Sequence, residues 1–118
     1  MKTALISVSN KEVISRVVSI ATYESTLRTA VNVLGNGIIP AYVTKTQDSP
    51  PRITVDIFCA AEPHETINVA VESSNIKGLR VGHHLNKIRM VLDVQSVDIP
   101  TFTIESVGNE LTVFLNAK

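Results

Sequence analysis

The sequence repeats itself, and this internal repeat constrains the fold more than any other feature. Four blocks recur in the same order: 27–33 with 88–94 and, before it, 18–20 with 79–81, both at an offset of 61 residues, then 39–42 with 99–102 at 60 and 53–55 with 111–113 at 58. In the first block apolar residues, an Arg and an amide or acid return at matching positions. The offset between the blocks changes so little that short loop deletions account for it. The sequence therefore predicts a duplicated half-domain.

The length of the chain indicates that the two halves share one core. At 118 residues the chain has the size of one ordinary domain, whereas either half alone would bury too little surface to be stable. We expect half-repeats at about 13–60 and 67–118 within a single domain over 13–118. Residues 1–12 then form an N-terminal extension or a first edge strand.

The hydrophobic pattern is that of strands throughout, with no sustained helical period. Strands are expected over nine segments: 13–21, 28–33, 38–46, 52–59, 67–71, 79–83, 88–94, 101–106 and 110–115. Breaks rich in Gly, Pro, Asn and Asp mark turns at 35–37, 47–51 and 108–109. The segment 60–65 reads as a bridge between the halves, with room for a short helical turn.

These elements predict an all-β fold, a β-sandwich of two pseudo-symmetric sheets from a duplicated half-domain. In the simplest arrangement each half supplies one sheet, and the other half covers it. The inward-facing residues would be those of the apolar stripes: Val31, Val33, Ile53, Val55, Ile57, Leu92, Val94, Leu111, Val113 and Leu115.

Composition disfavours several functions. Eleven basic and eleven acidic residues leave no net charge to attract nucleic acid, and five aromatic residues without Trp are too few for a base-stacking platform. Cys59, the single cysteine, cannot form a disulfide within the chain, and its apolar neighbours suggest a buried inert thiol. No exported leader or membrane-spanning run is recognisable, so we expect no membrane insertion by this chain.

The most regular polar feature is an Arg followed four residues later by Asp or Asn, in the pairs Arg28/Asn32, Arg52/Asp56 and Arg89/Asp93. On a strand the two residues of a pair share the face opposite the apolar stripe, but about 13 Å separates them. Pairing across neighbouring strands is therefore more plausible than pairing along one strand. The two interpretations are a cross-strand charge ladder and an exposed guanidinium surface that binds carboxylates.

Catalytic and metal-binding patterns are weak. His83 and His84 are adjacent, so on a strand they point to opposite faces and do not easily ligate one ion. His64 lies in a polar loop with no sign of a pocket for acid–base chemistry. Signature motifs of hydrolases, phosphate loops and zinc proteases are lacking, so we expect no enzyme, no metal and no cofactor.

Two linked motifs resemble the AMIN domain, a family found in front of cell-wall N-acetylmuramoyl-L-alanine amidases and type IV pilus secretins. Residues 49–57, Ser-Pro-Pro-Arg-Ile-Thr-Val-Asp-Ile, are similar to a Pro-x-Arg strand of that family. Residues 78–84 and 87–94 resemble its Arg-Val-Gly-Gln and Thr-Arg-Val-Val-Leu-Asp-Leu stretches in order and spacing. The chain departs from the family pattern at His83, in place of Gln, and at Phe114, in place of Asp.

The resemblance implies a non-catalytic module of the periplasm or cell envelope that binds peptidoglycan and localises an attached secretin or amidase. By this analogy the ligand-binding residues are Arg52, Arg80, Arg89, Asp56 and Asp93, since muropeptide stems carry carboxylates. The alternative is a protein-interaction module that docks a pilus or division protein through an exposed strand edge. Whether the module belongs to an amidase or to a secretin is left open.

Overall fold

The computed structural model describes residues 12–71 and 73–116, and this part of the chain forms nine strands and no helix. The strands, in chain order, are β1 (Val17–Glu24), β2 (Arg28–Gly35), β3 (Tyr42–Asp48), β4 (Pro51–Phe58), β5 (His64–Val69), β6 (Ile76–His84), β7 (Lys87–Val94), β8 (Phe102–Val107) and β9 (Glu110–Asn116). The all-β prediction is therefore confirmed.

Several predicted boundaries were wrong. β1 begins at Val17 instead of residue 13, and β3 begins only after Pro40, whose ring nitrogen cannot donate to a ladder. β3 runs on to Asp48, so the turn expected over 47–51 shrinks to Ser49 and Pro50. The bridge at 60–65 contains no helical turn, because β5 already starts at His64. The expected extension at 1–12 lies outside the described residues except for Glu12.

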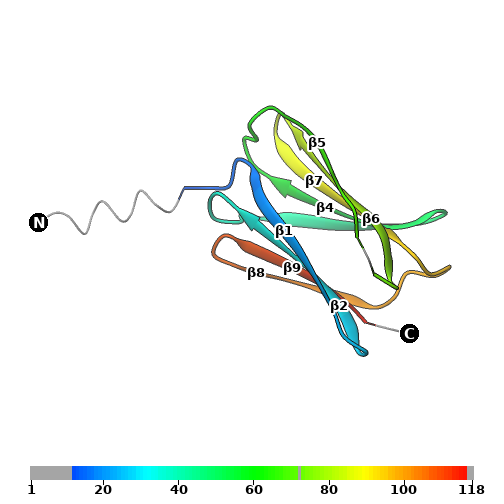
Figure 1. The fold of residues 1–118 in the computed structure, drawn as a ribbon. Helices are drawn as coiled ribbons and strands as arrows, with labels where there is room; N and C mark the ends of the chain where they lie inside the picture. Colours follow the sequence, from blue (N-terminus) through cyan, green and yellow to red (C-terminus); the bar gives the residue numbers. More distant parts are fainter. Residues whose placement is uncertain (1–11, 72, 117–118) are drawn as a thin grey trace, which may run out of the picture.

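The strands form two antiparallel sheets packed face to face, a β-sandwich (Figure 1). One is four-stranded in the order β1-β2-β9-β8, and the other is five-stranded in the order β3-β4-β7-β6-β5. Under the repeat, β1, β2, β3 and β4 correspond to β6, β7, β8 and β9, so the four-stranded sheet maps onto the first four strands of the other. The pseudo-symmetry inferred from the repeat is present, and β5 is an addition to one sheet.

The arrangement in which each half supplies one whole sheet was wrong. Hairpin β1-β2 of the first half lies beside hairpin β8-β9 of the second, and hairpin β3-β4 lies beside β6-β7. Each sheet thus takes one hairpin from each half, and the central ladders β2·β9 and β4·β7 join the halves. Alternation of apolar and polar residues gives the face on which a side chain lies, but it carries no information on which strands are neighbours.

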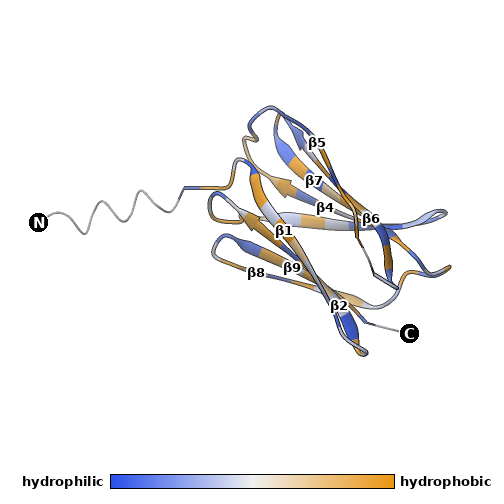
Figure 2. Ribbon diagram, in the orientation of Figure 1, coloured by the Kyte–Doolittle hydropathy of each residue, from blue (hydrophilic) through white to orange (hydrophobic). Residues whose placement is uncertain are grey.

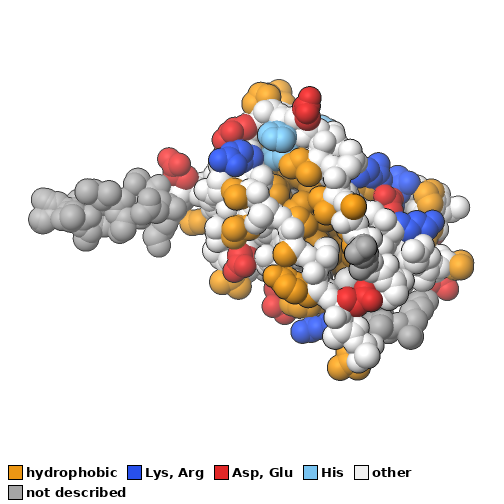
Figure 3. Space-filling model, in the orientation of Figure 1, with side chains coloured by type: hydrophobic (Ala, Val, Ile, Leu, Met, Phe, Trp, Pro, Cys, Tyr) orange, Lys and Arg blue, Asp and Glu red, His pale blue; other side chains and the backbone are white. Residues whose placement is uncertain are grey.

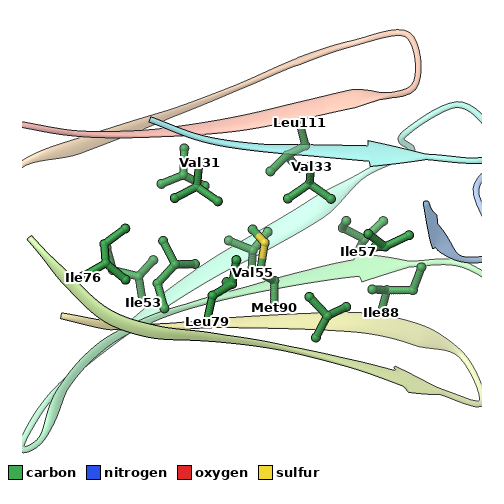
Figure 4. Packing of buried hydrophobic residues seen from close by; sticks show 14 of the residues in the cluster. Val31, Val33, Ile53, Val55, Ile57, Ile76, Leu79, Ile88, Met90 and Leu111 are labelled. Carbon is green, nitrogen blue, oxygen red and sulfur yellow. The ribbon is translucent and has the colours of Figure 1, made fainter. Parts of the chain in front are cut away.

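The core lies between the sheets, and every residue expected in it is buried. Val31, Val33 and Leu111 project from the four-stranded sheet toward Val55 and Met90 of the other (Figure 4). Figure 2 shows the corresponding alternation of apolar and polar residues along the strands. At roughly 25 cal/mol per Å² of apolar area removed from water, this shared interior is the main source of stability for both halves.

A short segment before β1 closes one end of this core. Ile14 is 1% exposed, its backbone N–H donates to the Ile38 carbonyl at 2.9 Å, and Val13 forms a parallel bridge with Ile38. A side chain at Gly35 would clash with Ile14, so the glycine leaves the space that Ile14 fills. The sandwich therefore depends on residues before its first strand.

The two central ladders differ in register. Arg89 lies opposite Asp56 in β4·β7, whereas its repeat equivalent, Arg28, lies opposite Asn116 in β2·β9. The sequence offset of 58 would equate Asp56 with Phe114, so the β2·β9 ladder is shifted by two residues relative to the repeat. A shift of two keeps the same side chains facing the core, which is why the repeat tolerates it.

The turn at Gly108-Asn109 was predicted correctly. Gly108 has φ of 59°, a conformation that other residues adopt only at a cost. No helix in the described part of the chain has the length and apolar character needed to cross a bilayer.

Candidate functional site

The outer face of the five-stranded sheet brings the Arg and Asp residues of β4 and β7 together. Arg52 lies directly opposite Asp93, and Asp56 lies directly opposite Arg89. The pairing is reciprocal because both strands carry Arg and Asp four residues apart and run antiparallel. The cross-strand charge ladder expected from the spacing is therefore present on this face.

Asp56 is the most tightly held residue of this face. Its carboxylate accepts hydrogen bonds from Arg89 Nε at 2.7 Å and from Arg89 Nη2 at 2.9 Å, and Lys87 Nζ lies 4.0 Å away. Asp56 is only 3% exposed, so the bidentate pair is what makes its burial tolerable. The same hydrogen bonds hold the pKa of Asp56 below its usual range, against the opposing effect of burial.

Asp93 is shared by two guanidinium groups. Arg80 Nη2 lies 3.3 Å from Asp93 Oδ1, and Arg52 Nε lies 3.7 Å from the same oxygen. Within the described residues, Nε of Arg52 and Nε of Arg80 have no hydrogen-bond partner although both atoms are buried. The single Asp93 carboxylate thus leaves a buried donor of each arginine unsatisfied.

These side chains border a groove of about 380 Å³ on the outer face. Its lining comes from strands β3 to β7: Gln47, Arg52, Thr54, Thr66, Arg80, Gly82, His84, Arg89 and Val91. Gly82 lies opposite Arg89 and contributes no side chain, which leaves the floor open between Arg89 and His84. We call this feature the arginine groove.

The face around the arginine groove is strongly basic. Among its described residues, five cationic side chains face two carboxylates, an excess of three positive charges in a chain with no net charge. Sequence reasoning missed two of these cations, Lys45 and Lys87. Lys45 lies across from Thr54 and Lys87 across from Phe58, so both belong to the outward-facing register. That register was the signal that could have identified them.

The outer face of the four-stranded sheet differs, although its β2 strand is the repeat of β7. Arg28 stacks on the Phe114 ring, with its guanidinium carbon 4.2 Å from the ring centroid, and lies opposite Asn116. Asn32 Nδ2 donates to Thr112 Oγ1 at 2.9 Å. A cation–π contact and a neutral hydrogen bond thus replace the two ion pairs of the other sheet. The basic groove belongs to one face only.

The histidines separate as their adjacency predicted. His84 lines the arginine groove, while Nε2 of His83 accepts a hydrogen bond from the backbone N–H of Val17 at 3.2 Å. The His64 and His83 ring centroids are 5.1 Å apart. Burial, followed by repulsion from His64, lowers the pKa of His83. The described residues contain no group of three or more His, Cys, Asp or Glu placed to hold a metal ion.

Cys59 is half-buried, and burial raises the pKa of its thiol. A thiol held in its protonated form is a poor nucleophile and a poor metal ligand. This agrees with the inert role expected from its apolar neighbours.

The described part of the chain forms a β-sandwich of two pseudo-symmetric sheets, with a basic groove on the outer face of the larger sheet. The AMIN domain model matches residues 29–115, well over half of the chain, and the chain belongs to the AMIN domain family. AMIN domains are non-catalytic, peptidoglycan-targeting modules of amidases and secretins in the cell envelope. A search of curated proteins gave no significant match to this chain.

Proposed function

We propose that this chain binds peptidoglycan through the arginine groove, and that it thereby localises an attached type IV pilus secretin or amidase in the periplasm. The observation that carries the proposal is the excess of basic groups around the groove, where the side chains of Arg52 and Arg80 are 30% and 43% exposed. Peptide stems of the wall end in carboxylates, which guanidinium groups bind through paired N–H donors.

The charged residues of the groove fall into two roles, support of the surface and contact with the ligand. Asp56 occupies Arg89 with two short hydrogen bonds, so this pair acts mainly as a rigid support. Arg52 and Arg80 share Asp93 at longer distances, so the exposed parts of their guanidinium groups are the ones available to a ligand. Of the five residues proposed from the sequence, Arg52 and Arg80 thus contact ligand directly, while Asp56, Arg89 and Asp93 hold the surface in place.

Co-sedimentation with purified sacculi at low salt tests the proposal. Arg52→Gln and Arg80→Gln should each weaken binding roughly tenfold, since a hydrogen bond to a charged group contributes about 1.5–3 kcal/mol. Arg28→Gln is the matched control, because Arg28 is the repeat equivalent of Arg89 but lies on the other sheet. Melting temperatures should stay close to that of the wild type.

A second design blocks the groove without removing charge. The three atoms nearest to a Cβ at Gly82 all belong to the His84 ring, the closest at 3.1 Å, so Gly82→Val should fold with a small shift of that ring and fill the floor. Loss of sedimentation in Gly82→Val with retention in Arg28→Gln supports the groove. If Arg28→Gln loses binding as strongly as Arg52→Gln, or if none of the groove variants loses it, the proposal is wrong.

A strand edge supports a second candidate, docking of a pilus or division protein by β-augmentation. Edge strands β1 and β5 carry register irregularities, whereas edge strands β3 and β8 pair regularly with their neighbours; β3, an edge of the sheet that carries the arginine groove, is the one to test. A regular edge is suited to the addition of a strand. Thr44→Pro would remove an edge donor there; loss of a protein partner that persists after wall digestion would favour this candidate.

A further inference from the structure

A second hollow lies at one end of the sandwich, where three connections meet. It is open to solvent and has a volume of about 740 Å³. The residues that line it are all of polar type and come from the end of β1, the β1–β2 turn, the segment before β6 and the segment after β7: Glu24, Ser25, Thr26, Ser74, Asn75, Gln95 and Ser96. We call it the end hollow, and none of its residues belongs to the arginine groove.

The walls of the end hollow are fixed by hydrogen bonds that cross between the sheets. The Glu24 carboxylate accepts from the Ser74 backbone N–H at 3.0 Å and from Ser74 Oγ at 3.1 Å. Asn75 Nδ2 donates to Oγ1 of the fully buried Thr29 at 2.6 Å, and the Gln95 N–H donates to the Asn75 carbonyl at 2.8 Å. The polar groups are therefore held in place before any ligand arrives.

Two polar side chains of the lining are not used by this framework. The Thr26 hydroxyl and the Gln95 amide make no hydrogen bond to any other described residue, and both side chains are exposed at the hollow. A hydroxyl and an amide together offer donors and acceptors without charge. This is the pairing capacity that hydroxyl- and amide-bearing ligands require.

The charge of the end hollow is opposite to that of the arginine groove. Glu24 is its only ionisable lining residue, and hydrogen bonds from Ser73 and then Ser74 hold the pKa of Glu24 below its usual range. A carboxylate kept ionised repels anionic ligands and accepts hydrogen bonds from O–H and N–H groups. The hollow therefore selects against the carboxylates that suit the other site.

We propose that the end hollow is a second binding site, which takes an uncharged N-acetylated sugar segment of a glycan strand. The identity of the glycan rests on the proposed function, in which the arginine groove takes the carboxylates of the peptide stems. Chemically, the two sites divide one ligand into its neutral and its anionic parts. Such a division increases affinity because the second contact is intramolecular once the first has formed.

The two sites lie along one path on the surface. Between them Pro50, Pro51, Lys77, Gly78, Asp93 and Val94 line a smaller depression of about 290 Å³. Five residues separate Asn75, in the end hollow, from Arg80, in the arginine groove, which corresponds to about 16 Å along the β6 strand. An elongated ligand of a few sugar rings with a peptide branch spans that distance.

Titration with a neutral oligomer of β-1,4-linked N-acetylglucosamine, followed by NMR, tests the inference. Amide shifts should concentrate at residues 24–26, 74–75 and 95–96. The double variant Thr26→Ala/Gln95→Ala should weaken the apparent affinity at least fivefold with an unchanged melting temperature. Thr103→Ala is the matched control, because Thr103 is an exposed threonine of β8 that lines neither the end hollow nor the arginine groove, and it should bind the oligomer like the wild type.

A synthetic stem peptide as a second probe separates this inference from the proposed function. Arg52→Gln should lose the peptide and keep the sugar oligomer, and the double variant should do the reverse. Peptide binding at the groove without oligomer shifts at the end hollow would overturn this inference alone. Oligomer binding without peptide binding would overturn the groove proposal and leave this site standing.

Discussion

At the scale of single residues, the ion pair of Asp56 and Arg89 links the stability of the sheet to its charged surface. Asp56→Asn leaves Arg89 without its two charged hydrogen bonds, and we expect the free energy of unfolding to fall by about 2 kcal/mol at pH 7. Urea denaturation measures this change. Glu105→Gln, an exposed change on β8, is the control and should stay within about 0.5 kcal/mol of the wild type.

The same pair predicts how stability depends on pH. Because the pKa of Asp56 is lower in the folded protein than its ordinary 3.8, its contribution is complete above pH 3.8 and is lost as the pH falls through the folded pKa. The difference in stability between wild type and Asp56→Asn should therefore narrow below pH 3.8. A constant difference down to pH 2 would contradict the role given to the ionised carboxylate.

Individual residues of the groove were predictable where they took part in a repeated spacing. Arg52, Asp56, Arg89 and Asp93 occur four apart on two strands, and antiparallel pairing of such strands brings opposite charges face to face. Gln47 was missed because polar residues before Ser-Pro-Pro were assigned to the turn, although β3 continues to Asp48. Composition near a proline does not distinguish the end of a strand from the turn that follows it.

At the scale of elements, His83 connects the two sheets at their β1 and β6 strands. Its Nε2 must be unprotonated to accept the Val17 N–H, and its pKa is lowered in the fold. The unfolded chain therefore takes up this proton first, and stability should fall as the pH drops below about 6.5, until the folded pKa is reached. We expect the melting temperature of the wild type to be lower at pH 5 than at pH 7.

His83→Gln tests this connection, because a side-chain amide oxygen accepts the same N–H at any pH. Melting temperatures at pH 7 and pH 5 should differ less for His83→Gln than for the wild type. His84→Gln is the control, since His84 lines the arginine groove on the outer face, whereas the hydrogen bond to β1 is made by His83. If His83→Gln retains the full pH dependence, the loss arises elsewhere.

The presence of the strands was easier to predict from the sequence than the residues at which they begin and end. Alternating residues identified nearly every strand, but the long bridge at Ala60–Glu65 concealed the start of β5, whose polar, exposed residues show no clear apolar stripe. Edge strands that have a solvent-exposed face and few buried residues show the weakest alternation of apolar and polar residues. For the same reason the fifth strand of the larger sheet, which has no counterpart in the first half, was assigned only in part.

At the scale of the whole molecule, the family match begins at residue 29 but the sandwich begins earlier. β1 pairs with β2 along its length, and Ile14 fills the end of the core. A fragment of residues 29–118 should therefore fail to unfold cooperatively in urea, because it exposes the β2 edge and the space beside Gly35. A fragment of residues 12–118 is the comparison and should show one cooperative transition.

The repeat did not reveal which strands belong to which sheet. A duplicated pattern is satisfied equally by halves that lie side by side and by halves that interleave, since both bury the same residues. In Figure 3 apolar side chains gather near the middle of the visible face, and charged ones lie mostly around them. Only the strand order, which depends on long-range pairing, distinguishes the two.

The exchange of hairpins between halves has a consequence for ancestry and for engineering. A lone half would present two hairpins whose inner strands both lack a neighbour, and a second copy would complete both ladders at once through a two-fold axis. The chain thus has the form of a swapped homodimer whose subunits have been fused. It should be severable in the loop after β4 into two polypeptides that reassemble on mixing, as in split-reporter systems.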